Sequence, residues 1–219
     1  MKENMIIKKI LNNTFYIGLF LITLIRLIQD SNVFNIQEQA VFFVKIIAAV
    51  CFGIKIITQK YSKKQFIITA LLLGIATYTT IVTRVPMVLL TTMIFIAIKD
   101  DDIEKTIKII FYTTIVTLII HMVFFTYDYF TNFDKIEILN TSNRINRYSF
   151  HFRHPNTLAA IIFACVMEWE YLYYNKVSIK FQSIVIVASM IFMYMITKSR
   201  TLLIMFLLLW AGIIIIKLK

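Results

Sequence analysis

The run TLLIMFLLLWAGIIII, residues 201–216, contains no charged side chain and ends directly at Lys217. Its apolar residues follow one another continuously, without the polar–apolar alternation of a strand in a membrane barrel. A bilayer core about 30 Å thick takes roughly 20 helical residues to cross, and a helix satisfies its own backbone polar groups. This run is therefore predicted to be a transmembrane helix.

The rest of the chain has the same character. Of its 219 residues, 59% are hydrophobic and only 16% are charged, and the mean hydropathy is +0.78. Apolar runs recur along the whole length, while Gly and Pro are rare. The composition therefore predicts an all-α integral membrane protein, with residues 1–219 forming a single polytopic membrane domain.

Polar breaks divide the chain into about eight predicted transmembrane helices. In chain order these are residues 14–28, 39–57, 66–82, 86–98, 106–127, 155–174, 182–197 and 201–216. Some are shorter than a full crossing and would need flanking residues or local thinning of the bilayer. The longest polar segment, residues 128–154, is predicted to be the main extracytoplasmic loop.

The lysines predict the orientation, because short cytoplasmic loops carry an excess of positive charge. Most of them precede the first predicted helix or follow the second, fourth, sixth and eighth: Lys2, Lys8, Lys9, Lys60, Lys63, Lys64, Lys99, Lys105, Lys176, Lys180, Lys217 and Lys219. Both termini are therefore predicted to be cytoplasmic. The net charge of +11 is explained by this topology and by attraction to anionic lipids of the bilayer, and no nucleic-acid partner is predicted.

The arginines follow the opposite rule. Five of the six fall in segments predicted to lie outside: Arg84, Arg144, Arg147, Arg153 and Arg200. A guanidinium group can grip a phosphate or a carboxylate through two N–H groups at once. Their clustering on the outer face predicts an anionic ligand there. The alternative is that they are ordinary loop cations, paired with Asp128, Asp134 and Glu137.

The stretch RYSFHFRHPNTLAA, residues 147–160, concentrates hydrogen-bonding side chains just before an apolar run. Pro155 fits the first position of a helix, where its missing N–H costs nothing, so His154 is predicted to be the N-cap. The free N–H groups and the positive end of that helix would face whatever Arg147 and Arg153 hold. Diphosphate is a suitable ligand for a site made of these arginines and the helix N-terminus.

Two histidines of this stretch, His151 and His154, allow further interpretations. Their spacing is weak evidence for zinc, since there is no HExxH motif and Cys51 and Cys165 lie inside predicted helices. No metal and no cofactor are therefore predicted. A histidine beside cationic arginines and a helix N-terminus should stay neutral, which suits a general base. The alternative is a loop histidine that merely caps the helix.

Residues 147–158, with Arg147, Ser149, Phe152, His154, Pro155 and Asn156, resemble the R-x-S-x-G-F-x-H-P-N-x segment of Gram-positive capsular and exopolysaccharide polymerases. These are Wzy-type proteins, related to O-antigen polymerases and O-antigen ligases. Thr197–Thr201 resembles the S-R-T/G motif that the family carries between two helices downstream. Arg84 and the segment Ala97–Asp100 resemble its short turn and A-K-(D/N) exit more loosely. The likeness covers roughly residues 80–205, and His151 stands where the family has Gly, so the backbone turn is expected to be altered there.

The resemblance implies an activity and a set of functional residues. Such proteins transfer a glycan from undecaprenyl diphosphate to a hydroxyl of another lipid-linked repeat unit, on the outer face of the bacterial cell membrane. The catalytic candidates are His154 and Arg147. The candidates for binding diphosphate or sugar are Arg84, His151, Arg153, Asn156 and Arg200. Arginines in place of a divalent ion would stabilise the charge that develops on the leaving diphosphate. A flippase and a chain-length regulator are the implied protein partners.

Three alternatives stay open. A flippase or other transporter of lipid-linked oligosaccharides would also need cations for diphosphate, but near the bilayer midplane rather than at one face. An O-antigen ligase-like transferase would use similar residues on another acceptor. Family members continue for several helices beyond the point that corresponds to Lys219, so the chain is expected to be short relative to them, and an inactive fragment is the third alternative.

Overall fold

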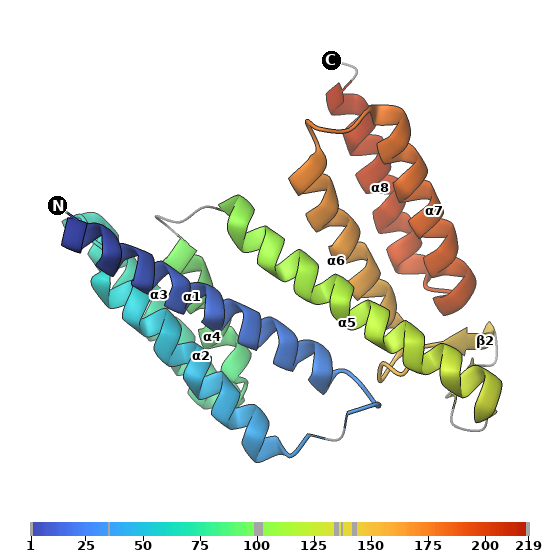
Figure 1. Cartoon of the computed structure of the whole chain (residues 1–219), viewed down its shortest axis with the longest axis horizontal. Coiled ribbons are helices and arrows are strands. Elements are labelled where there is room, and N and C mark those ends of the chain that lie inside the picture. The colour runs from blue at the N-terminus through green and yellow to red at the C-terminus, as the bar shows by residue number, and fades with distance from the viewer. Residues whose placement is uncertain are drawn as a thin grey trace. The chain divides into compact units, whose positions relative to one another are not determined.

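The computed structural model describes residues 2–34, 36–98, 103–133, 136, 138–141 and 144–217, and for residues 2–12, 138–141 and 144–146 the backbone alone. Within these ranges the chain forms eight α-helices and one two-stranded sheet (Figure 1). The elements, in order, are α1 (Lys2–Gln29), α2 (Glu38–Thr58), α3 (Lys63–Thr83), α4 (Pro86–Ala97), α5 (Ile103–Thr131), β1 (Ile138–Thr141), β2 (Arg144–Tyr148), α6 (Pro155–Tyr173), α7 (Ile179–Thr197) and α8 (Arg200–Lys217).

Each predicted apolar run overlaps one of these helices, although α1 begins at Lys2, well before the predicted start at residue 14. Five of those described are long and apolar enough to cross a membrane, namely α2, α3, α5, α7 and α8. Helix α4 has 12 residues, about 18 Å of rise, which is less than the thickness of a bilayer core. Helix α6 has 19 residues but includes Glu168 and Glu170. The chain is thus mainly helical and compatible with an all-α membrane protein.

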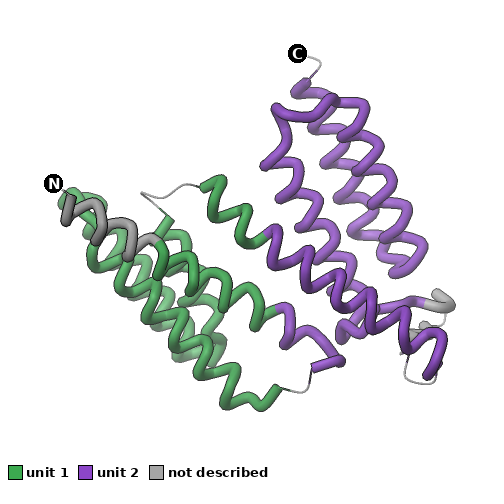
Figure 2. Tube along the Cα trace, in the orientation of Figure 1, with its two compact units in different colours: residues 1–26, 36–110 green, residues 27–35, 111–219 purple. Residues whose placement is uncertain are grey.

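The chain divides into two compact units (Figure 2). Unit 1 comprises residues 1–26 and 36–110, and unit 2 comprises residues 27–35 and 111–219. Helices α1 and α5 contribute residues to both units. The short segment between α1 and α2 belongs mainly to unit 2, together with the hairpin and the last three helices.

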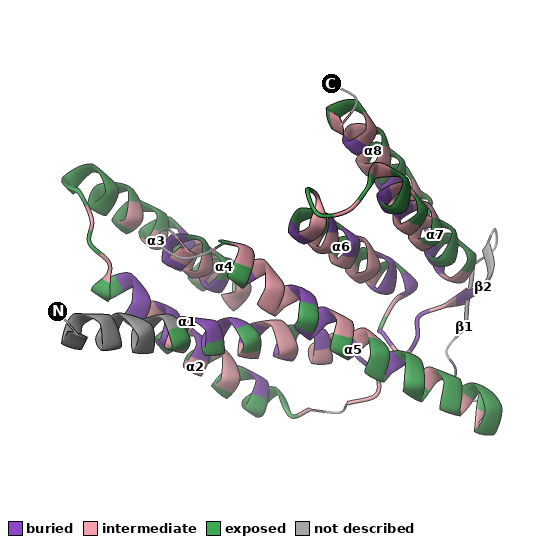
Figure 3. Ribbon diagram, turned by 45° about the horizontal axis from the view of Figure 1, so that its top comes forward, coloured by how far each residue is buried: buried purple, intermediate pink, exposed green. Residues whose placement is uncertain are grey.

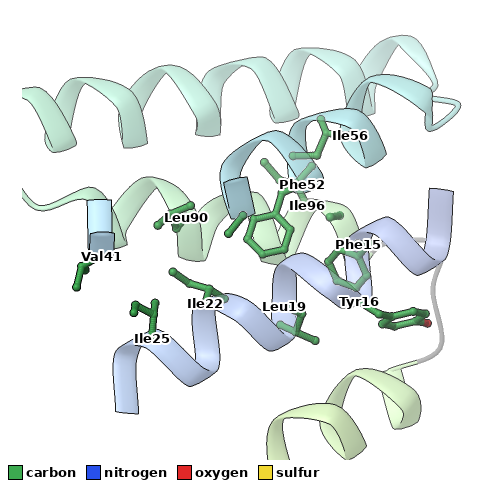
Figure 4. Packing of buried hydrophobic residues seen from close by; sticks show 12 residues of the cluster. Phe15, Tyr16, Leu19, Ile22, Ile25, Val41, Phe52, Ile56, Leu90 and Ile96 are labelled. Carbon is green, nitrogen blue, oxygen red and sulfur yellow. The ribbon is translucent and has the colours of Figure 1, made fainter. Parts of the chain in front are cut away.

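Unit 1 has a core of apolar side chains from α1, α2 and α4 (Figure 4). Phe15 and Phe52 are fully buried, with ring centroids 5.8 Å apart, and Leu90 of α4 joins the same cluster. Helices α1 and α2 approach closely at Gly18, where a Cβ atom would lie 2.7 Å from Cys51 Cβ. Glycine at this position therefore lets the two backbones pack against each other.

Unit 2 has a separate core between α6, α7 and α8. Ala159, Ile186, Met193 and Phe206 are fully buried and form one cluster. In the same unit, the Trp210 indole N–H donates to Ser183 Oγ over 3.0 Å. Three helices are thus held together by apolar packing with a polar contact between α7 and α8.

Much of the helical surface outside these cores is exposed (Figure 3). Many of the exposed residues are large and hydrophobic. Helix α3 is the clearest case, since Ala76 is its buried residue while Phe66, Leu71 and Ile81 are all exposed. Soluble proteins seldom expose contiguous apolar patches of this kind. These faces fit contact with lipid.

Parts of the predicted loop at residues 128–154 have regular secondary structure. Helix α5 runs through its beginning to Thr131, and β1 and β2 form an antiparallel hairpin in its middle. Ile138 lies opposite Tyr148, and Leu139 lies opposite Arg147. The hairpin was not predicted, although β2 is one of the elements that present the candidate functional residues.

Candidate functional site

Most of the predicted functional residues meet at one end of unit 2, where α5 ends, α6 begins and α7 turns into α8 (Figure 1). Strand β2 packs against α7 in this region. Six of the seven candidates belong to it: Arg147, His151, Arg153, His154, Asn156 and Arg200. We call these six residues the polar end of unit 2.

Arg147 joins the two main sequence segments that carry the family resemblance. Its Nε donates to the carbonyl oxygen of Thr197, the last residue of α7, over 2.7 Å. Its Nη2 donates to Asn156 Oδ1 over 2.6 Å. Arg147 is only 4% exposed, and a carbonyl at a helix C-terminus is a favourable partner for a buried cation. Residues 147–158 and 197–201 therefore form a single structure, although Arg147 and Thr197 are 50 positions apart.

The prediction that His154 caps α6 is confirmed. Its backbone is extended, with φ −151° and ψ 143°, and Pro155 opens the helix. The ring Nδ1 accepts the backbone N–H of Asn156 over 3.0 Å. In a neutral imidazole the proton must then be on Nε2. His154 consequently presents a hydrogen-bond donor rather than a free lone pair.

Two consecutive residues before α6 have left-handed backbones. Phe150 has φ 50° and His151 has φ 62°, a conformation that costs a residue other than glycine about 1–2 kcal/mol. Phe150 and Phe152 are buried in a cluster with Leu158, and this packing fixes the bend. The sequence predicted an altered turn where His151 replaces glycine. The turn nevertheless has the left-handed backbone that glycine adopts most easily.

The segment between α1 and α2 also holds the left-handed turn before α6, through backbone hydrogen bonds. The backbone N–H of Arg153 donates to the Asp30 carbonyl over 2.8 Å, and the N–H of Asn32 donates to the His151 carbonyl over 2.6 Å. Between these two hydrogen bonds, Ser31 and Phe152 form an antiparallel bridge. The backbone of residues 151–153 is therefore fixed on both sides.

His121 supports the same segment, and the sequence did not single it out for the site. The side chain is fully buried, Nδ1 lies 2.8 Å from the Thr117 carbonyl, and Nε2 lies 2.7 Å from Ser31 Oγ. A carbonyl can only accept, so Nδ1 donates and Ser31 donates to Nε2. The ring also stacks on Phe152, with centroids 4.1 Å apart and planes 12° apart. A histidine inside an apolar helical run is the signal that could have indicated this role.

Asp128 lies beside His151 at the end of α5. Asp128 Oδ2 is 3.2 Å from His151 Nε2, and the side chains are 17% and 10% exposed, respectively. The ring N–H does not point directly at the carboxylate, so the contact is close without being an aligned hydrogen bond. Asp128 was considered as an ion-pair partner for the arginines. In the structure its carboxylate lies beside the His151 ring. The other two acids considered, Asp134 and Glu137, lie outside the described residues.

Two arginines of the polar end have exposed side chains. Arg153 precedes the cap of α6, and Arg200 is the first residue of α8. Neither guanidinium makes an ion pair or a hydrogen bond with the part of the chain that the structure describes. Both are cations that a ligand could reach. Arg144 begins β2, and its side chain is outside the description.

The seventh candidate, Arg84, belongs to unit 1. It ends α3 in a left-handed conformation, with φ 57°, and it is exposed in the short turn before α4. The predicted location of Arg84 in a tight turn is confirmed. Its role in binding stays a prediction.

A second group of polar side chains lies at the other end of α6. Lys217 Nζ donates to the Tyr174 carbonyl over 2.6 Å, and Gln182 Nε2 donates to the same carbonyl over 3.0 Å. Glu170 is only 4% exposed, and its carboxylate makes no hydrogen bond within the described residues. These contacts hold the C-terminus of α6 against α7 and α8.

Comparisons of the chain with models of protein families, with curated proteins and with solved structures find no match.

Proposed function

We propose that this chain is a polysaccharide polymerase of the bacterial cell membrane, with eight transmembrane helices and both termini in the cytoplasm. It would transfer a glycan from undecaprenyl diphosphate to a hydroxyl of another lipid-linked repeat unit, outside the membrane. In this topology the polar end of unit 2 faces outward, and the opposite end of α6, with Lys176 and Lys180 beyond it, faces the cytoplasm.

The observation that carries the proposal is the position of Arg147. Its guanidinium donates both to Thr197 in one sequence segment and to Asn156 in the other. These two segments carry the resemblance to the polymerases, and nothing in their local sequence requires them to meet. Their contact supports the interpretation that they belong to one functional site.

The exposed cations of this end fit a diphosphate leaving group. In the proposed reaction, the bond between the sugar C1 and the diphosphate oxygen breaks, and negative charge grows on the diphosphate. Fixed positive groups aimed at that charge stabilise the transition state more than the ground state. Arg153 and Arg200 are exposed and would bind the diphosphate, while the buried charge of Arg147 adds to the positive potential.

The N-terminus of α6 would contribute the positive end of its helix dipole, which favours an anion. It offers no free backbone donors in its first turn, because Pro155 has no N–H and the N–H groups of Asn156, Thr157 and Leu158 all donate to His154. His154 presents its Nε2–H at the same place, because its Nδ1 is occupied by the Asn156 N–H. His154 would therefore position or protonate the diphosphate rather than accept a proton.

The proposal is tested by deleting the gene and sizing the lipid-linked intermediates. We expect single repeat units on undecaprenyl diphosphate to accumulate, and wild-type protein to restore long polymer. Arg200→Ala should lower the rate of polymerisation by about 10²- to 10³-fold, as the loss of a single transition-state donor does. The matched control is Lys180→Ala, which removes an exposed cation from the other end of the same unit. Normal polymer in the deletion strain would refute the proposal.

A further inference from the structure

The proposed transfer needs a group that accepts the proton of the attacking hydroxyl, and His154 is a poor candidate for it. A general base must present an unprotonated atom to the proton that it removes. The lone pair of His154 Nδ1 already accepts the backbone N–H of Asn156. Releasing that lone pair would uncap α6.

The pair of Asp128 and His151 has the arrangement that His154 lacks. Asp128 Oδ2 lies 3.2 Å from His151 Nε2. A carboxylate can only accept, so this neighbour favours the tautomer with the proton on Nε2 and the lone pair on Nδ1. Within the described residues, no hydrogen bond involves His151 Nδ1.

We propose that His151 is the general base of the site and that Asp128 is the residue that positions it. This inference rests on the proposed function and names its proton acceptor. As the acceptor hydroxyl forms its bond to the sugar C1, its proton passes to His151 Nδ1. The bond from C1 to the diphosphate oxygen breaks, undecaprenyl diphosphate leaves with that electron pair, and His151 later returns the proton to water.

The surroundings of His151 fit a precise placement of the ring. The left-handed backbone at φ 62° and the hydrogen bond from Asn32 to the His151 carbonyl fix where the side chain starts. The Phe125 ring lies 6.1 Å from the imidazole, with planes 65° apart. The contact with Asp128 is close but not aligned, and hydrogen bonds of catalytic groups often align only when substrate is bound.

The test uses the full-length protein in vesicles, with lipid-linked repeat units extracted from the deletion strain as substrate. We expect His151→Ala to lower turnover at saturating substrate by about 10²- to 10⁴-fold, the usual contribution of a general base. Added imidazole should restore part of that turnover. Asp128→Asn should also lower turnover while changing the apparent KM less than twofold. The control is Asp30→Asn, which removes a carboxylate from the same region, where the backbone of Asp30 rather than its side chain makes the contact with Arg153.

The tautomer of His151 gives a measurement that does not depend on activity. Nitrogen NMR of the wild-type protein should show His151 protonated on Nε2, and Asp128→Asn should mix the two tautomers. Full turnover of His151→Ala in vesicles where wild type polymerises would overturn the role of His151 and leave the proposed function standing. Protonation of His151 on Nδ1 would overturn it as well. Wild-type vesicles that form no polymer would instead refute the proposed function, and this inference with it.

Discussion

The turn between α3 and α4 and the turn between α7 and α8 are built alike. Each first helix ends on a threonine, Thr83 or Thr197, whose hydroxyl donates to the carbonyl four residues earlier, over 2.7 Å and 2.8 Å. Each hydroxyl also accepts the N–H two residues later, over 3.3 Å in both turns. The next residue, Arg84 or Lys198, is left-handed, with φ 57° and 52°. The following helix begins one residue after that accepted N–H.

The two turns differ in what surrounds them. Thr83 and Arg84 are exposed, whereas Thr197 is fully buried and Ser199 is 4% exposed. The Thr197 carbonyl accepts a hydrogen bond from the Arg147 guanidinium. Local sequence therefore explains the shape of both turns, but only tertiary contacts make the second turn part of a polar site. Variants at matched positions separate these two contributions.

Arg147→Ala should have the largest effect on stability. It leaves the Thr197 carbonyl and the Asn156 amide without their partner, and a hydrogen bond to a charged group contributes about 1.5–3 kcal/mol. We expect the free energy of unfolding in detergent to fall by about 3 kcal/mol. Arg147→Lys should lose nearly as much, because an ammonium group cannot make both contacts in the same geometry.

Arg84→Ala is the matched control for that variant. Arg84 is exposed, and its side chain makes no hydrogen bond or ion pair with the described residues. We expect a change within about 0.5 kcal/mol, as for most surface substitutions. Equal losses for the two alanine variants would mean that the Arg147 contacts do not stabilise unit 2.

Thr197→Val should have a smaller effect than Arg147→Ala and a larger effect than Thr83→Val. Both variants keep the shape of the side chain and remove the hydroxyl that supports the turn. The buried site cannot replace those hydrogen bonds with water, so we expect a loss of about 1–2 kcal/mol for Thr197→Val. Thr83→Val should cost about 0.5 kcal/mol. Chemical unfolding followed by circular dichroism measures both, and a larger loss at Thr83 would contradict the contrast in burial.

Glycine at the left-handed positions should have the smallest effect, and the same effect in both turns. Lys198→Gly and Arg84→Gly each relieve a conformational cost of about 1 kcal/mol. Part of that gain is lost because glycine also makes the unfolded chain more flexible. We expect a net stabilisation of about 0.5 kcal/mol in each case, measured by the same unfolding experiment. Opposite signs would show that the two turns are not equivalent.

Much of the fold follows from the sequence. Uninterrupted apolar runs predicted the helices, and Pro155 predicted both the start of α6 and the cap at His154. The hairpin was missed, because strands of four and five residues give little periodic signal. The end of α5 was also placed too early, since Asp128 and its polar neighbours continue the helix to Thr131.

The candidate site could be predicted only in part. The residue types and the two segments were recognisable, but the partner of each side chain depends on how distant segments meet. Arg147 was expected to bind a ligand, which stays a prediction, and the contacts of its guanidinium with Thr197 and Asn156 were not predicted. The contact of Asp128 with His151 and the support from His121 also join residues far apart in sequence. No local pattern specifies such contacts.

The most direct test of the proposed activity is to reconstitute the purified protein in vesicles with single lipid-linked repeat units. We expect longer lipid-linked chains to form, with one undecaprenyl diphosphate released for each new linkage. Repeat units that move across the bilayer without any change in length would contradict it, because the protein would then be a transporter.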